Sequence, residues 1–236
     1  MKKAINLLIF TLLCTALIAQ EKRETLNEIE TEVINNVNET DFFSNFQTII
    51  LPKPNKDCEA KLVDCLQKRK SSYTLDSTEI SQQMLANILW AGWGFTEENR
   101  KTAPSSQNKN EIWIAVALPT GTYCYNSYHN CLIQINEYDI RPLTFKDCQN
   151  NDIIPPISLI YICNKDNIDC KNKAFINATA YGTCGGIAQN IYLYCSGENI
   201  GTYFNSTYDY TRLKQVLNLP NNNFIIGCQP IGYIYK

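Results

Sequence analysis

Histidine and methionine are nearly absent from this chain, whose 236 residues include one histidine, His129, and two methionines. A hydrolase built on a Ser-His or Cys-His pair would have to use His129, and the sequence places no nucleophile beside it. His129 lies in the polar stretch 125–130, where we expect a loop. No Cys-x-x-Cys pair occurs, so the usual zinc ligand spacings are also missing. The sequence therefore predicts no metal site and identifies no catalytic residue.

An excess of charge of one sign is also lacking. The chain has 21 Lys and Arg against 23 Asp and Glu, a net charge of -2, and no long basic run. Binding to nucleic acid or to anionic membranes depends on clustered Lys and Arg. We therefore expect neither nucleic acid nor a membrane surface as a partner.

The first residues have the pattern of a secretory signal peptide. Lys2 and Lys3 precede an apolar run from Ala4 to Ala19, and cleavage is predicted before Gln20. A membrane anchor is the alternative, but the run is shorter than the roughly 20 residues that a spanning helix needs. The sequence predicts a signal peptide at 1–19 and a secreted, extracellular or lumenal protein without a membrane segment after cleavage.

The remainder divides into an acidic lead, 20–50, and a domain, 51–236. The lead has an apolar stripe at helical spacing, which predicts a helix packed on the domain or on a second subunit. The stripe consists of Leu26, Ile29, Val33, Ile34 and Val37. The domain is long enough for a substantial hydrophobic core.

Eleven cysteines, of which one lies in the signal peptide, leave an even number that indicates disulfides in an oxidising compartment. Cys58 and Cys65 fall on a predicted helix, 57–68, which would hold their Cα atoms about 10 Å apart, too far for a disulfide. Two other pairs flank polar turns and are free to close: Cys163 with Cys170, and Cys124 with Cys131. The full connectivity stays open.

Three Asn-x-Ser/Thr sequons, at Asn38, Asn177 and Asn205, are possible glycosylation sites. They agree with a secretory protein. An Asn-rich chain also carries some sequons by chance.

A helix is predicted from Asp76 onward, with Asp76 as its cap and Glu79 completing a capping box. Apolar residues then recur at helical spacing from Ile80, and Gly92 and Gly94 are expected to end the helix. The same reasoning predicts helices at 186–195 and 210–217.

Strands are predicted at 112–118, at 157–163 and in a hairpin of 123–125 with 132–135, after a turn at 119–121. A closing strand, 224–235, is expected to be interrupted at Pro230. Helices and strands mix without a regular alternation, which predicts an α+β fold.

Several motifs together resemble the nitroreductase superfamily, and most closely its azoline (thiazole and oxazole) dehydrogenase branch. In order they are Leu51-Pro52-x-Pro54, Arg69-Lys70-Ser71-Ser72, Leu89-Trp90-Ala91-Gly92-Trp93-Gly94, Thr102-Ala103-Pro104-Ser105-Ser106, and the segments 186–193 and 226–233. The resemblance implies a central, mostly antiparallel sheet packed among helices, a homodimer, and FMN bound between the subunits.

The resemblance also implies site residues. Arg69 and Ser71 match the first two positions of an RxSxR corner that holds the FMN phosphate, because a guanidinium and a hydroxyl suit a dianion. A polar turn matches the segment that approaches the flavin ring, and Ser206 falls in a further flavin segment. The turn residues are Pro104, Ser105, Ser106 and Asn108. Flavin carries hydride chemistry itself, so the implied activity is oxidoreduction, with NADH or NADPH as donor and an unknown small acceptor.

The chain departs from the family pattern at three of these positions. Tyr73 replaces the second basic residue of the corner, Ser206 replaces a glycine, and Gly186 replaces a histidine that is common in the azoline branch. The competing hypothesis is therefore a non-catalytic secreted binding or structural protein that kept the fold and lost the flavin.

Overall fold

The computed structural model describes residues 47–57, 59–145 and 153–235. Seven strands form one sheet in the order β1-β6-β5-β4-β7-β9-β8, and every neighbouring pair is antiparallel. The strands are β1 (Thr48–Ile50), β4 (Ile112–Leu118), β5 (Gly121–Asn126), β6 (Cys131–Asn136), β7 (Ile157–Asn164), β8 (Ile200–Thr202) and β9 (Asn223–Tyr233). A separate small hairpin joins β2 (Phe95–Glu97) to β3 (Arg100–Lys101).

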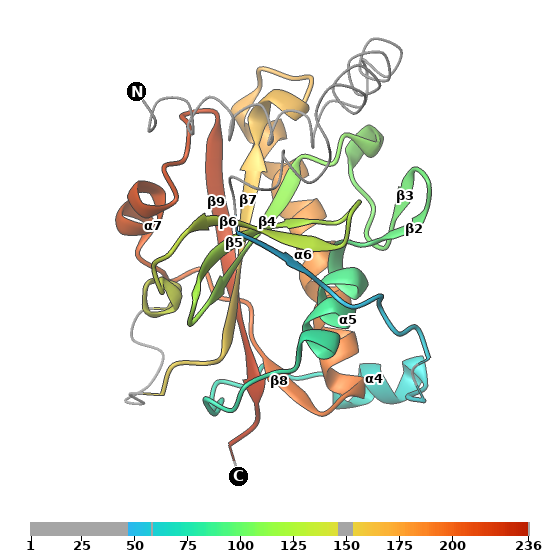
Figure 1. Ribbon diagram of the computed structural model, residues 1–236. Coiled ribbons are helices and arrows are strands. Elements are labelled where there is room, and N and C mark those ends of the chain that lie inside the picture. The colour runs from blue at the N-terminus through green and yellow to red at the C-terminus, as the bar shows by residue number, and fades with distance from the viewer. Residues whose placement is uncertain (1–46, 58, 146–152, 236) are drawn as a thin grey trace, which may run out of the picture.

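The α-helices of the described part are α4 (Leu62–Lys68), α5 (Gln82–Trp93), α6 (Lys173–Gly197) and α7 (Tyr210–Val216). Short 3-10 helices are η2 (Ser106–Asn108), η3 (Arg141–Leu143) and η4 (Lys165–Asn167). Figure 1 shows α4, α5 and α6 on one side of the sheet and α7 on the other. The α+β class and the antiparallel sheet among helices are thus confirmed.

Alternation along the strands builds two cores, because successive side chains of a strand point to opposite faces. On β4, Ile114 and Val116 face the larger core with α5 and α6, whereas Ala115 and Ala117 face the smaller core that includes Leu213 of α7. β4 and β7 are buried on both faces along nearly their whole length. The centre of the sheet therefore provides a rigid support for both helix layers.

The start of α5 differs from the prediction. Ser81, not Asp76, is the cap, and its hydroxyl accepts the backbone N–H of Met84 at 3.2 Å. The Asp76 carboxylate instead accepts the N–H of Thr78 in a local turn. Both are good capping residues, and Leu75 pairs with Ile234 in an isolated β-bridge, which keeps the chain extended there. Gly94 ends the helix as expected, while Gly92 lies inside it.

The helix predicted at 57–68 is shorter, since α4 begins only at Leu62. The distance argument against a Cys58–Cys65 disulfide therefore loses its basis, and Cys58 lies outside the described residues. The helix predicted at 186–195 is longer, because α6 begins at Lys173. Its cap is Asn172, whose side chain accepts the N–H groups of Ala174 and Phe175. Gly182, Gly185 and Gly186, near the middle of α6, weaken the helical pattern in the sequence.

The predicted hairpin and the strand at 157–163 are confirmed, and the helix at 210–217 agrees with α7 within one residue. The predicted interruption at Pro230 is wrong, because β9 runs through it and Ser158 of β7 pairs with it. β8 pairs with β9 only from Ile231 onward. Pro230 therefore stands where one neighbouring strand is absent, a position that tolerates a missing N–H.

The predicted boundary at residue 50 also moves, because Thr48–Ile50 forms β1 and pairs with β6 at the edge of the sheet. The predicted signal peptide, the apolar stripe of the lead and Asn38 lie outside the described residues. No helix in the described ranges combines the length and the apolar composition that a membrane span requires.

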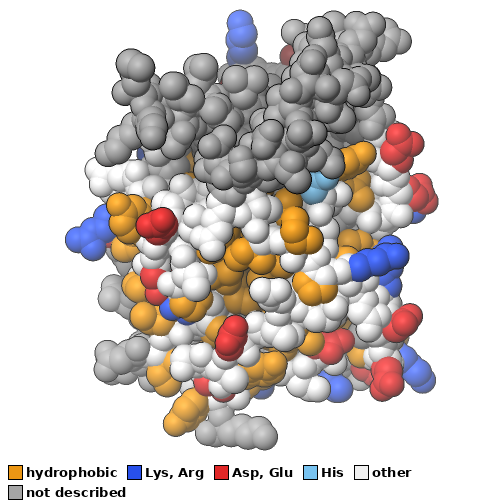
Figure 2. Space-filling model, in the orientation of Figure 1, with side chains coloured by type: hydrophobic (Ala, Val, Ile, Leu, Met, Phe, Trp, Pro, Cys, Tyr) orange, Lys and Arg blue, Asp and Glu red, His pale blue; other side chains and the backbone are white. Residues whose placement is uncertain are grey.

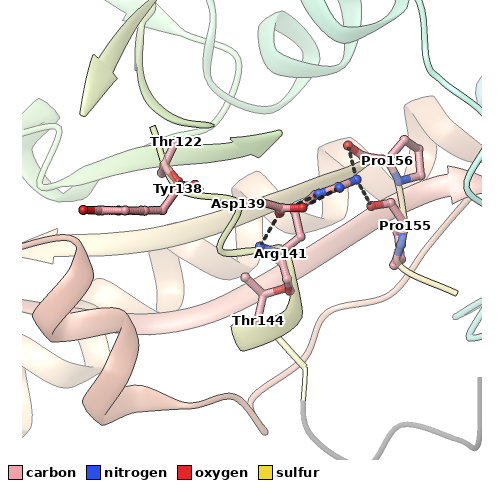
Figure 3. Close-up of polar contacts among 7 residues, drawn as sticks. All are labelled: Thr122, Tyr138, Asp139, Arg141, Thr144, Pro155 and Pro156. Carbon is pink, nitrogen blue, oxygen red and sulfur yellow. Dashed lines mark hydrogen bonds and ion pairs between the residues drawn. The ribbon is translucent and has the colours of Figure 1, made fainter. Parts of the chain in front are cut away.

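Arg141 ties together the two sides of the gap at 146–152 (Figure 3). Its guanidinium donates to both carboxylate oxygens of Asp139, at 2.8 and 2.7 Å, and to the carbonyls of Pro155 and Pro156, at 3.0 and 3.3 Å. This bond network lowers the pKa of Asp139. The Thr144 hydroxyl donates in turn to the Arg141 carbonyl at 2.7 Å. The side chain thus acts as a buried structural clamp.

Charged side chains of both signs are interspersed on the face shown in Figure 2, where hydrophobic and uncharged polar groups lie between them. That face has no field of one sign, in keeping with the net charge of -2.

Candidate functional site

Arg69 and Ser71 lie where α4 ends and the chain becomes extended beside α6. The Arg69 guanidinium lies over the ring of Tyr192, 5.3 Å from its centroid. The Ser71 hydroxyl is 3.0 Å from the Tyr192 hydroxyl, which also accepts the backbone N–H of Phe204 at 2.6 Å. Tyr192 therefore joins the predicted phosphate corner to the segment that contains Ser206.

The predicted ring-binding turn packs on the same helix closer to its N-terminus. The Asn190 amide of α6 donates to the Thr102 carbonyl at 3.1 Å, and a side chain at Gly186 would meet Pro104 at an ordinary 3.8 Å. Gly186 and Tyr192 are six residues apart, about 9 Å along the helix axis. The two predicted site segments therefore contact the same helix at two different levels.

Within the turn, two predicted residues already have structural roles. The Ser105 hydroxyl accepts the Asn110 N–H at 3.0 Å, and the Asn108 amide donates to the Asn99 carbonyl at 2.9 Å. Pro104 and Ser106 are exposed. Gln107 and Asn108 have positive φ angles, so the turn is held in a specific backbone shape.

Ser206 is exposed, but the residue before it is not. Asn205 is 6% exposed, and its amide donates to the carbonyls of Thr144 at 3.0 Å and Thr207 at 2.8 Å. A glycan on this nitrogen would have to displace both bonds, so the folded structure does not favour the sequon at Asn205. Asn177, on the first turns of α6, is partly exposed.

An open strip of α6 lies between these two contacts. Ala178, Gly182, Gly185 and Gln189 are exposed and recur at helical spacing, and a side chain at either glycine would meet nothing within 4 Å. At 3.6 residues per turn, Gly186 and Tyr192 fall on opposite flanks of this strip. The predicted residues therefore border an accessible face of the central helix.

The two basic residues before the turn are occupied elsewhere. Arg100 pairs with Glu97 at 2.7 Å on the exposed β2–β3 hairpin. The Lys101 ammonium lies 4.3 Å from the Trp93 ring centroid and 4.7 Å from that of Phe95, and donates to Ser127 at 2.8 Å. Burial lowers the pKa of Lys101 to about 7. Its contacts hold it among aromatic rings.

Glu111, which the sequence analysis did not single out, is a fully buried acid. One carboxylate oxygen accepts the Thr183 hydroxyl of α6 at 2.5 Å, and the other has no hydrogen-bond partner within the described chain. Burial raises the pKa of Glu111. The sequence offered one signal, an acid directly before a continuous apolar strand.

Five of the described cysteines have raised pKa values, the opposite of what an activated thiolate requires. Burial raises the pKa of Cys131 to about 11 and that of Cys163 to about 12, and it also raises the pKa values of Cys184, Cys195 and Cys228. A nucleophilic cysteine needs a lowered pKa.

The two cysteine pairs at polar turns, which the sequence left free to close, are not joined by disulfides, because Cys131, Cys163 and Cys170 are free thiols. Cys131 pairs with Asn126 across the β5–β6 ladder and is thus out of register with Cys124. Cys163 points into the larger core. Disulfides elsewhere in the chain stay a prediction.

Comparison with protein families gives a match to the nitroreductase family model over residues 66–233, more than two thirds of the chain. The chain belongs to the nitroreductase family. A nitroreductase relative from Methanocaldococcus jannaschii is 25% identical over 185 residues, which cover 74% of this chain and 91% of the relative.

Solved structures show the same fold. A nitroreductase structure from Ralstonia eutropha has a TM-score of 0.73 and 26% identity, with 80% of this chain and 90% of that chain covered. The E. coli microcin synthetase McbBCD complex has a TM-score of 0.64 at 15% identity, with 85% and 82% covered, and at that identity it shows the fold alone.

Tyr192 and Phe204 are the residues of the site that sequence reasoning missed. Tyr192 lies within the matched segment 186–193, but that resemblance gave it no role. Its contacts could not be predicted locally, because its partners are more than ten residues away in the sequence.

Proposed function

We propose that this nitroreductase-family protein is an oxidoreductase that binds FMN and transfers hydride to a small acceptor. The observation that carries the proposal is that the Arg69 guanidinium has no carboxylate partner in the described chain. It lies over the ring of Tyr192, whose hydroxyl is bonded to Ser71, at the border of the open face of α6. A cation without a carboxylate partner and a hydroxyl held by the same tyrosine are a suitable donor set for a phosphate.

The other residues fit a flavin in a supporting role. The backbone of the Pro104–Asn108 turn has a defined shape, and the absence of side chains at Gly182 and Gly185 leaves room along α6. FMN, when bound, supplies the hydride chemistry itself. The tasks left to the chain are to hold the phosphate with Arg69 and Ser71, to orient the ring, and to limit access of water.

Family resemblance also supports a homodimer and a reduced nicotinamide donor. A dimer would cover the open strip of α6, whose small residues allow close approach of another surface. Analytical ultracentrifugation tests the dimer, and a mass of one chain at micromolar concentration would contradict it.

The experiment for the cofactor is the absorbance spectrum of the purified protein before and after incubation with FMN. We expect a visible flavin band that stays with the protein through gel filtration. Anaerobic addition of NADH and then NADPH should bleach that band and identify the donor. Protein that retains no flavin contradicts the proposal. Protein that retains flavin without reduction by either donor supports binding and contradicts turnover with these two donors.

A non-catalytic protein of the same fold is the second candidate, and Tyr73 favours it. Its ring packs against Tyr203 with centroids 5.0 Å apart, where the family corner has a second basic residue. The phosphate group would therefore have one arginine and not two from this corner.

Secretion is the remaining part of the proposal, supported by the basic start and apolar run at 2–19. N-terminal sequencing of the protein recovered from expressing cells tests it. Mature protein beginning near Gln20 is the expected result, and a retained Met1 in all of the recovered protein would contradict it.

A further inference from the structure

A cavity of about 300 Å³ opens beside the 68–72 segment, away from the Ser71 hydroxyl. Its lining includes Lys68, Lys70 and Ser72 from this segment, Tyr192 and Ser196 from α6, and Thr202 from β8. Arg69 and Ser71 do not line it. Alternate residues of an extended chain point to opposite sides, so the segment presents one polar set to the flavin corner and a second set to this cavity.

The charge in the cavity is uncompensated. Lys68 and Lys70 both line it, no Asp or Glu is among its lining residues, and neither lysine forms an ion pair within the described ranges. Lys68 is at the last turn of α4, where a cation stabilises the helix end. That role does not account for Lys70, which lies beyond the helix. Two cations that line the same cavity repel each other, and a bound anion reduces that cost.

Four hydroxyl groups belong to the lining residues, and three of them already have partners. The Tyr192 hydroxyl is bonded to Ser71 and Phe204. Thr202 donates to the Pro230 carbonyl at 2.7 Å, and Ser196 donates to the Cys65 carbonyl at 3.1 Å. Ser72 is 9% exposed, and its backbone N–H is fixed on the Thr202 carbonyl at 3.0 Å. Its hydroxyl makes no hydrogen bond to a described residue, so it is positioned and free to donate.

The rest of the lining is mostly apolar. Ile200, Ile234, the Tyr192 ring and one polar residue, Asn199, complete the cavity. A volume of about 300 Å³ is at the lower end for ligand pockets, which fits a small molecule with a compact apolar part. We propose that this cavity binds a small phosphate monoester between Lys68, Lys70 and Ser72, at a site separate from the Arg69–Ser71 flavin corner.

Phenyl phosphate is a suitable probe, titrated calorimetrically into the full chain at low salt. We expect saturable binding that weakens as salt is added, because charge-assisted contacts are screened. Lys70→Gln should lower the affinity about tenfold, and Ser72→Ala should lower it less. Lys61→Gln is the matched control, since Lys61 is an exposed lysine at the other end of α4 and does not line the cavity. It should bind as the wild type does.

Two outcomes would overturn binding in this cavity: no saturable binding by the wild type, or a Lys70→Gln affinity equal to that of the wild type. Arg69→Gln tests whether the site is separate. Unchanged phenyl phosphate affinity is expected, and a loss as large as that of Lys70→Gln would contradict separation.

A second titration in the presence of saturating FMN distinguishes a free phosphate monoester from the phosphate of the flavin. Unchanged phenyl phosphate affinity supports a separate site, whereas displacement by FMN overturns it. A protein that binds phenyl phosphate but no flavin would contradict the proposed oxidoreductase and support this cavity.

Discussion

The hydroxyl groups of Ser71 and Tyr192 lie 3.0 Å apart, although 121 residues separate them in the sequence. Because the Tyr192 hydroxyl also accepts the Phe204 N–H, one phenol joins the loop after α4, the central helix and the segment after β8. These are three of the segments that border the candidate site. The Tyr192 side chain therefore links all three segments.

Tyr192→Phe should lower the free energy of unfolding by about 1–2 kcal/mol, because the Phe204 N–H loses its acceptor while the ring is kept. Urea denaturation measures the change. Tyr181→Phe is the control on the same helix, since Tyr181 is 54% exposed, and it should leave stability within about 0.5 kcal/mol of the wild type. Equal stabilities for the two variants would show that the Tyr192 hydroxyl contributes nothing.

Arg69→Gln should weaken FMN binding about tenfold and leave riboflavin binding unchanged, because only FMN carries the phosphate that Arg69 is proposed to hold. Flavin fluorescence quenching gives both dissociation constants. A similar loss for both flavins would instead place Arg69 near the ring or in a purely structural role.

Arg141→Ala should destabilise the protein by about 3 kcal/mol, because loss of the buried guanidinium leaves Asp139 and two proline carbonyls without their donor. Arg212→Ala is the control, since Arg212 is an exposed arginine 3.8 Å from Asp209, and its removal should cost well under about 1 kcal/mol. Thermal denaturation of both variants gives the comparison. A destabilisation of Arg141→Ala no larger than that of Arg212→Ala would contradict the clamp.

Glu111 should make stability fall as the pH rises. Its folded pKa is raised by burial, so the folded state favours the protonated acid. That contribution is fully present below the unfolded pKa, about 4.3, and is lost as pH rises through the folded pKa. Glu111→Gln stays neutral and should therefore lose less stability than the wild type between pH 4 and 8.

Denaturant midpoints across that pH range measure the Glu111 effect. Glu79→Gln is the control, because Glu79 is exposed, and it should retain the pH profile of the wild type. Parallel stability–pH profiles for Glu111→Gln and the wild type would mean that folding does not raise the pKa of Glu111.

Local patterns determined much of the architecture without any structure. The continuous apolar run at 112–118 predicted β4, the runs after the next turn predicted the β5–β6 hairpin, and the ordered motifs predicted the family. Each of these signals spans about ten residues or fewer, so local sequence preferences are enough to predict the elements. The position of helix ends was less predictable, because both Asp76 and Ser81 are suitable caps and only the bridge of Leu75 with Ile234 favours the later start.

By itself, the sequence determined the runs that form β4, β5, β6, β7 and β9, the α+β class and the basic-serine segment at 69–72. Only the tertiary structure decided which groups the two sides of that segment contact. It placed Ser71 on the Tyr192 hydroxyl, directed Lys70 and Ser72 into a cavity, and carried β9 through Pro230. The physical reason is that side-chain partners and strand neighbours come from distant parts of the chain, and their proximity is created only when the sheet and α6 pack together.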